Sequence, residues 1–180
     1  MFLGYNLKLF LNTFFLFSQN KKEGMKLKKV LFISSTGGHL RELMRLEPLF
    51  KNYDYSIITE KNVTTERLKE RYRVYYVPYS TRSKIISYFF KYTFVILKSI
   101  FLFIKIKPDA IVSTGTHTAV PICFIGKFLN KKIVYIETYA NITRKSLTGK
   151  ILYPISDIFI VQWKEMKKLY PKAICIEDSI

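Results

Sequence analysis

The sequence contains few acidic residues, few histidines and few cysteines, and each shortage excludes a class of protein. There are 13 Asp and Glu against 30 Lys and Arg, a formal charge of +17, so a polyanion or an anionic surface is the expected neighbour. The only two cysteines, Cys123 and Cys175, exclude a disulfide framework and fit a reducing compartment. The only two histidines form no cluster with zinc spacing, so no metal site is expected.

The basic residues are mostly lysine, and this argues against sequence-specific nucleic-acid recognition. Of the 30 basic residues, 23 are Lys and 7 are Arg, whereas base reading relies on the planar fork of arginine. The length of 180 residues and the 49% apolar content predict one folded domain with a single core. We therefore expect no nucleic-acid partner and a diffuse attraction to phosphate groups.

Residues 2–17 form a mainly apolar segment, and five lysines follow between residues 21 and 29. The apolar run is shorter than the roughly 20 residues of a membrane-spanning helix, and its flanks are not those of a secretory signal. Two interpretations stay open. Either residues 1–24 are a short membrane anchor whose following side faces the cytoplasm, or the chain starts at Met25. The folded domain is expected over residues 25–180.

The segment from Ser80 to Lys107 carries lysines seven residues apart among nearly continuous apolar and aromatic side chains. A seven-residue step drifts only about 20° around a helix, so the lysines form one narrow stripe. The segment predicts a helix over about 82–107 that lies on an anionic membrane surface, with lysines reaching the phosphates. The alternative is a core helix whose lysines face solvent. The four lysines are Lys84, Lys91, Lys98 and Lys105.

Short β-branched runs alternate with helical patterns along the whole domain. This order predicts an α/β fold with a mostly parallel, Rossmann-like sheet. The expected strands are 29–34, 55–59, 74–77, 109–114, 132–137 and 157–161. Besides the lysine-striped segment, the expected helices are 40–49, 65–71, 119–129 and 146–153.

Two loops at predicted strand ends combine glycine with hydroxyl side chains, and each contains one histidine. Backbone N–H groups beside glycine can approach an oxyanion, so both loops are candidate diphosphate sites. The first loop matches neither a dinucleotide-binding nor a P-loop motif, and a tight strand-to-helix turn would explain its glycines equally well. His39 is a candidate general base. The candidate diphosphate residues are Ser35, Thr36, Gly37, Gly38, Thr114, Gly115, Thr116 and His117.

A third polar loop, Glu137 to Asn141, follows the strand 132–137. A carboxylate at a strand end can accept hydrogen bonds from sugar hydroxyls or orient a catalytic group. Helix capping is the simpler interpretation of Glu137 on this segment alone. Thr138 and Asn141 are candidate contacts for an acceptor sugar.

Taken together and in this order, the loops resemble one family. It is the membrane-anchoring subunit of the two-part N-acetylglucosaminyltransferase of lipid-linked oligosaccharide synthesis (the asparagine-linked glycosylation protein 14 family), with bacterial relatives in capsule and exopolysaccharide synthesis. A more distant similarity is to the N-terminal domain of the peptidoglycan glycosyltransferase that makes lipid II. The resemblance covers about residues 26–172. It rests on Ile-Ser-Ser-Thr-Gly-Gly-His-Leu (33–40), Ser-Thr-Gly-Thr-His-Thr-Ala-Val-Pro (113–121), Glu-Thr-Tyr-Ala-Asn (137–141) and Ser-Leu-Thr-Gly-Lys (146–150).

The resemblance implies one half of a GT-B glycosyltransferase, namely the N-terminal type of domain that takes the acceptor. A separate partner chain would bind the UDP-sugar, and the acceptor would be a polyprenyl-diphosphate-linked sugar at the cytoplasmic face of the membrane. By the same resemblance His39 and Glu137 are the expected catalytic residues. No metal or other cofactor is expected, since such an inverting site needs none.

Two alternative functions remain open at this point. A complete small enzyme acting on a nucleotide or phosphosugar would be active alone, and a basic nucleic-acid-binding domain would bind with steep salt dependence.

The family ends in a glycine and aromatic tail that helps to dock the partner. Residues 173–180 contain neither glycine nor an aromatic residue, so the docking segment differs here.

Overall fold

The computed structural model describes residues 27–79 and 85–176. These residues form one seven-stranded sheet in which all neighbouring strands are parallel, so the expected Rossmann-like α/β fold is confirmed. The last strand was not predicted from the sequence. The strands are β1 (Lys29–Ile33), β2 (Asp54–Glu60), β3 (Val74–Val77), β4 (Ala110–Ser113), β5 (Lys132–Ile136), β6 (Ile158–Val161) and β7 (Ile174–Cys175).

The strand order β3-β2-β1-β4-β5-β6-β7 contains one reversal. The chain first builds outward from β1 through β2 to β3, and then returns to place β4 on the other side of β1. Ligands of open parallel sheets bind outside the carboxyl ends of the strands at such a reversal. The loops that follow β1 and β4 lie at this point.

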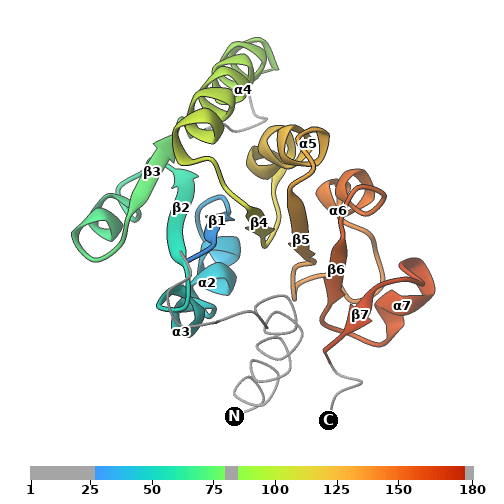
Figure 1. Ribbon diagram of the computed structural model, residues 1–180. Helices are drawn as coiled ribbons and strands as arrows, with labels where there is room; N and C mark the ends of the chain where they lie inside the picture. Colours follow the sequence, from blue (N-terminus) through green and yellow to red (C-terminus); the bar gives the residue numbers. More distant parts are fainter. Residues whose placement is uncertain (1–26, 80–84, 177–180) are drawn as a thin grey trace.

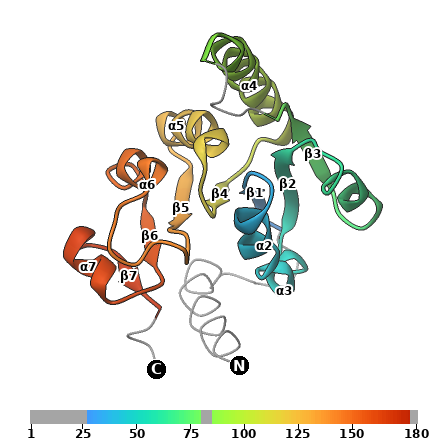
Figure 2. The ribbon, with the colours of Figure 1, turned by 180° about the vertical axis from the view of Figure 1, so that it is seen from behind.

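Helices cover the two faces of the sheet unequally (Figures 1 and 2). The helices α4, α5 and α6 lie along one face, and α2 and α3 lie along the other, beside β1 and β2. The short 3-10 helix η1 lies beyond the β3 edge. The helical elements are α2 (Gly38–Met44), α3 (Glu47–Phe50), η1 (Glu66–Glu70), α4 (Ile85–Ile106), η2 (His117–Ala119), α5 (Val120–Phe128), α6 (Leu147–Leu152) and α7 (Glu165–Leu169).

Alternating side chains of the strands build a separate apolar layer on each face. Leu31 and Ile33 of β1 pack in the layer under α4, α5 and α6, whereas Val30 and Phe32 pack in the layer with α2 and α3. Both faces of the central strands are therefore buried, as is usual for a parallel sheet.

Two predicted helices differ from the observed ones. The expected helix over 40–49 is divided into α2 and α3, and Pro48 lies in the first turn of the second helix, where a missing N–H costs nothing. The expected helix over 65–71 is a 3-10 helix. Residues 1–26, Lys84 and the chain end from residue 177 lie outside the described residues, as do the interpretations that concern them.

Candidate functional site

His39 lies between the loops that follow β1 and β4. Both its side chain and its backbone form hydrogen bonds with the second loop. Its ring Nδ1 atom is 2.9 Å from the Thr114 carbonyl oxygen, and the Thr114 hydroxyl donates to the His39 carbonyl oxygen at 2.8 Å. These two bonds join residues 75 positions apart. The structure thus brings together the two loops that the sequence marked as separate candidates.

The Thr114 carbonyl determines which ring nitrogen of His39 is available for chemistry. A carbonyl oxygen can only accept, so Nδ1 carries the proton of this hydrogen bond. The neutral imidazole then has its lone pair on Nε2. The His39 side chain is 32% exposed, so part of the ring is accessible at the edge of the sheet where the strands end.

The first loop offers backbone to a ligand, while its serine side chain is buried. Gly37 and Gly38 are exposed, and a Cβ built on either would meet no heavy atom within 4 Å in the described part of the chain. Gly37 has φ +74°, which favours glycine. Thr36 is half-buried, whereas Ser35 is buried and donates to the Thr36 carbonyl oxygen at 3.2 Å. Of the predicted residues here, the two glycines and Thr36 are accessible.

The second loop has a strained backbone. Gly115 has φ +114° and is packed against the His39 ring, and the next residue, Thr116, has φ +79°. A β-branched residue in this conformation costs about 1–3 kcal/mol and persists only where the surroundings hold it. Thr114 and Gly115 are buried, whereas Thr116 and His117 are half-buried. Strain of this kind is concentrated at functional loops.

Glu60, at the end of β2, was not predicted as a site residue, yet it supports the second loop. It is buried, its Oε1 atom accepts from the Thr118 hydroxyl at 3.0 Å, and the same oxygen is 3.8 Å from His117 Nε2. On the other side, the Tyr92 hydroxyl of α4 donates to the His117 carbonyl oxygen at 3.2 Å. The loop is therefore connected both to the sheet and to α4.

Glu42, one turn after His39 on α2, joins the first loop to the third. Its Oε1 atom accepts from the Thr138 hydroxyl and from the Tyr139 backbone N–H, both at 3.0 Å. Its Oε2 atom is buried without a hydrogen-bond partner among the described residues and lies 3.9 Å from His39 Nδ1. This role could not be predicted from the sequence, because Glu42 resembles any charged residue of a surface helix.

Glu42 therefore links Thr138 to His39. Asn141 follows in the same turn, where its backbone N–H donates to the Thr138 carbonyl oxygen at 3.2 Å. The Tyr139 ring packs against the Trp163 ring at a tilt of 45°, with ring centroids 4.5 Å apart, and the Trp163 indole N–H donates to the Tyr139 carbonyl oxygen. These contacts hold the third loop in place next to the first.

Glu137 is buried beneath the third loop and binds internal donors with both carboxylate oxygens. Oε2 accepts from the Ser146 hydroxyl at 2.9 Å and from the Tyr170 hydroxyl at 3.0 Å, and Oε1 accepts from the Thr138 N–H at 3.1 Å. Ser146 is the N-cap of α6, and its Oγ atom accepts from the Gly149 N–H. Glu137 thus holds the N-cap residue Ser146 at the start of α6 but does not itself cap this helix. Its expected part in catalysis stays a prediction.

The two tyrosines nearest this carboxylate are held in their neutral form. Burial raises the pKa of Tyr135 well above its usual value, and the negative charge of Glu137 adds to the effect. The pKa of Tyr170 is raised by the same two causes and by its hydrogen bond to Glu137. Both hydroxyls therefore act as donors throughout the physiological pH range.

Helix α4 packs against the domain along one side and exposes aromatic and aliphatic side chains along the other. Val95, Ser99, Leu102 and Phe103 are buried. Lys98 and Lys105 lie on the flank toward η1, at the border between the two sides. Among the described helices none is both long and apolar enough to cross a bilayer. Six apolar residues of α4 are more than half exposed, namely Phe89, Phe90, Phe94, Leu97, Phe101 and Ile104.

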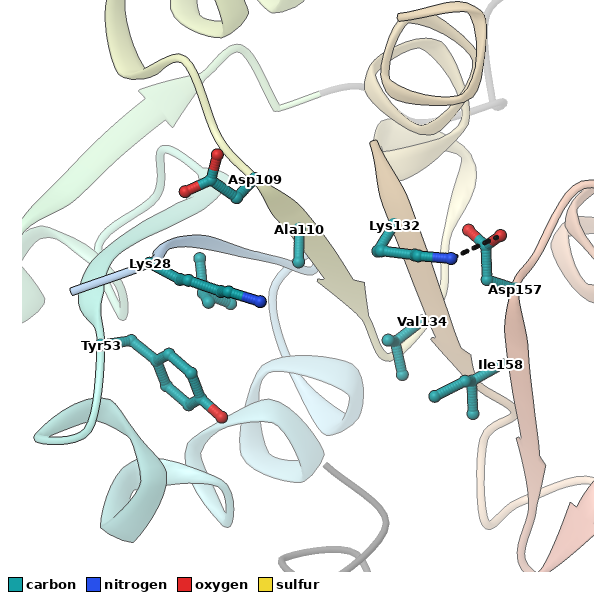
Figure 3. Close-up of a pocket in the computed structure, with 9 residues that line it drawn as sticks. Lys28, Tyr53, Asp109, Ala110, Lys132, Val134, Asp157 and Ile158 are labelled. Carbon is teal, nitrogen blue, oxygen red and sulfur yellow. Dashed lines mark ion pairs between the residues drawn. The ribbon is translucent and has the colours of Figure 1, made fainter. Parts of the chain in front are cut away.

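A cavity of about 350 Å³ lies at the opposite edge of the sheet, where the strands begin (Figure 3). Tyr53 and Lys28 line one side and Lys132 with Asp157 lines the other. Both carboxylates that line the cavity accept hydrogen bonds from backbone N–H groups at this edge of the sheet. Asp109 accepts from the Lys29 N–H and Asp157 accepts from the Ile133 N–H. The cavity is therefore separate from the loops that contain His39.

The chain is similar over most of its length to one protein family. Residues 30–177 match the family model described as "Oligosaccharide biosynthesis protein Alg14 like". The mouse (Mus musculus) protein named UDP-N-acetylglucosamine transferase subunit ALG14 is 30% identical over 174 residues, covering 81% of this chain and 80% of the relative. The human (Homo sapiens) protein of the same name is 30% identical over 172 residues with the same coverage.

Among solved structures, MurG from Acinetobacter baumannii superposes with a TM-score of 0.62 at 16% identity over 77% of this chain. The chain spans 42% of that structure, so it corresponds to less than half of its length. This likeness shows the fold, the N-terminal type of domain of the GT-B architecture. The matched family model and the identity to the two mammalian proteins show that the chain belongs to the Alg14 family.

Proposed function

We propose that this protein is the acceptor-binding subunit of a two-component inverting glycosyltransferase. A separate chain binds the UDP-sugar, and the acceptor is a sugar linked to a polyprenyl diphosphate. The partly exposed His39 ring, bonded through Nδ1 to Thr114 and adjacent to the exposed Gly37 and Gly38, is the observation that carries the proposal. The names of the relatives, which are transferase subunits, support the division of labour.

His39 acts as general base in the proposed reaction. Nε2 takes the proton of the attacking acceptor hydroxyl while its oxygen forms a bond to the anomeric carbon. The bond from that carbon to the UDP oxygen breaks on the opposite side, which inverts the configuration. The backbone around Gly37 and Gly38, with the loop at Thr116 and His117, binds the acceptor diphosphate, and Thr138 with Asn141 contacts its sugar.

The exposed side of α4 lies on the cytoplasmic face of the membrane, where a lipid-linked acceptor is found. Lys91, Lys98 and Lys105 border the apolar side chains, as in helices that lie in a membrane interface. Because Tyr92 of the same helix donates to the His117 carbonyl, α4 couples the membrane surface to the proposed diphosphate site. We propose that the product serves capsular or exopolysaccharide synthesis, as the resemblance of the loops suggests.

Sugar transfer in a reconstituted system tests the proposal. Labelled UDP-sugars and a polyprenyl-diphosphate acceptor are supplied to this chain, to a candidate donor-binding chain, and to both together. We expect transfer only with both chains and a loss of roughly 10²-fold or more for His39→Ala, the usual contribution of a general base. Transfer by this chain alone, or full activity of the His39→Ala variant, would contradict the proposed function.

A further inference from the structure

A basic groove lies between η1, β3 and the second half of α4, away from the loops that contain His39. Its volume is about 810 Å³. Two carboxylates, Glu66 and Glu70, are outnumbered by the cations that line it. The cations are Lys61, Arg67, Lys69, Lys98 and Lys105.

Most of this positive charge is not used to hold the fold together. Lys61 pairs with Glu66 at 3.5 Å, and the Lys105 ammonium lies 5.2 Å from the centre of the Tyr75 ring. In the described part of the chain, Arg67, Lys69 and Lys98 form no ion pair. Several cations that converge without partners create a potential that attracts an anion.

The groove is also continuous with the apolar side of α4. Phe101 lines it and is 62% exposed, and Leu97, one turn earlier, is 59% exposed. A ligand held here would have its charged part among the cations and an apolar part along the helix. This combination matches an amphiphile with an anionic head.

We infer that this groove binds the phosphodiester headgroup of an anionic membrane lipid, with the acyl chains beside Phe101 and Leu97. The inference rests on the proposed function in that α4 lies on the membrane. It adds a discrete lipid site to which η1 contributes Arg67 and Lys69, two cations that lie outside the lysine stripe. Such a site fixes how the domain is rotated on the membrane, since one cationic wall comes from η1 and the other from α4.

Binding of the full chain to vesicles tests the inference. We compare phosphatidylcholine vesicles with vesicles that also contain phosphatidylglycerol, using Arg67→Gln/Lys69→Gln against the matched control Lys168→Gln/Lys172→Gln at the β7 end of the sheet. Both double variants lose the same charge from exposed positions. We expect the groove variant to bind the anionic vesicles roughly ten- to thirtyfold more weakly, and the control to change less than about threefold. Equal losses would show diffuse attraction and overturn the inference.

A soluble short-chain phosphatidylglycerol, below its micelle concentration, separates a lipid site from a phosphate site. We expect it to shift the NMR signals of the Tyr75 ring, and expect no such shift in the groove variant. An equal shift with inorganic phosphate would overturn the lipid assignment. It would also be overturned if DNA displaced the bound short-chain phosphatidylglycerol and added lipid did not. Sugar transfer in detergent keeps the two proposals apart. The groove variant should retain it, whereas absence of transfer in the unaltered protein would count against the proposed function alone.

Discussion

Glu42 holds its Oε2 atom 3.9 Å from Nδ1 of His39, the residue that we propose as general base. When Nε2 takes a proton, the ring becomes cationic, and a carboxylate at this distance stabilises that state. The Glu42 side chain is 15% exposed, against 32% for His39. It is therefore a positioning residue that acts through His39 and through the third loop.

Replacing Glu42 by Gln should separate the effect of its negative charge on catalysis from the effect of its size and hydrogen bonds. The amide keeps an acceptor for Thr138 and Tyr139 but removes the negative charge beside the imidazole. We expect kcat of the two-chain enzyme to fall roughly tenfold, with KM for the acceptor nearly unchanged. The control is Glu47→Gln on α3, whose carboxylate accepts from the Tyr72 hydroxyl. Equal kcat values for the two variants would contradict the role of Glu42.

Gly149 should be intolerant of a side chain, although it lies within a helix. Alanine normally stabilises a helix by about 1 kcal/mol relative to glycine. Here a Cβ would overlap the Glu137 carboxylate and the Tyr170 hydroxyl. We expect Gly149→Ala to lower the free energy of unfolding by about 1–3 kcal/mol, measured by urea denaturation. A stability equal to or above that of the unaltered protein would show that the Glu137 cluster is not rigid.

At the scale of elements, α4 has a buried and an exposed side, and its sequence pattern already separated them in part. The lysine spacing predicted a helix with an unusually wide apolar surface, and the structure shows a helix over Ile85–Ile106. The spacing did not show which apolar residues pack inward. That depends on the position of α5 and β3, which contact α4 in the structure.

Removing aromatic side chains from the exposed side of α4 should weaken membrane binding without unfolding the protein. Phe90 and Phe94 are more than half exposed. We expect Phe90→Ser/Phe94→Ser to partition into vesicles at least about tenfold more weakly, because two large apolar side chains no longer enter the interface. Ile151→Ser/Ile174→Ser, on α6 and β7, is the control and should bind as before. Unchanged flotation of the α4 variant would argue against this orientation.

The shortest elements could not be predicted from the sequence. Helix α7 has five residues and β7 has two, so neither provides a full period of apolar spacing. They become ordered through the sheet edge, where β7 pairs with β6. The strands of four or more residues were predicted because each is a run of mainly β-branched and aromatic or aliphatic residues between turn residues. One example is β3 at Val74–Val77.

At the scale of the whole molecule, the alternation of elements predicted the parallel sheet but not its strand order. The pairing of β1 with β4 brings His39 to Thr114, and the neighbouring pairing of β4 with β5 brings Glu42 to Thr138. These contacts join residues 75 and 96 positions apart. The sequence could therefore mark the loops as candidates, whereas the geometry that selects His39 Nε2 required the fold.

The stability of the whole molecule should decrease at alkaline pH through the two buried tyrosines. Their pKa values are raised above 10.0 in the folded protein, so only the unfolded chain loses these protons just above that pH. The stabilisation is complete below about pH 10 and is lost as the pH rises further. We expect the free energy of unfolding to fall by up to about 1.4 kcal/mol per pH unit for each tyrosine. Tyr170→Phe should reduce this slope, and phenolate absorbance from both tyrosines in the folded protein would contradict the expectation.

The central claim is that this chain supplies the acceptor half of a divided enzyme. Calorimetric titration of the purified chain, without any partner, with a short-chain polyprenyl-diphosphate sugar and separately with UDP-N-acetylglucosamine tests it most directly. We predict binding of the lipid diphosphate, weakened by substitution of Gly38 by a bulky residue such as Val, which would fill the open space beside the first loop. We predict no binding of the UDP-sugar. Binding of the UDP-sugar and not of the lipid diphosphate would contradict the account.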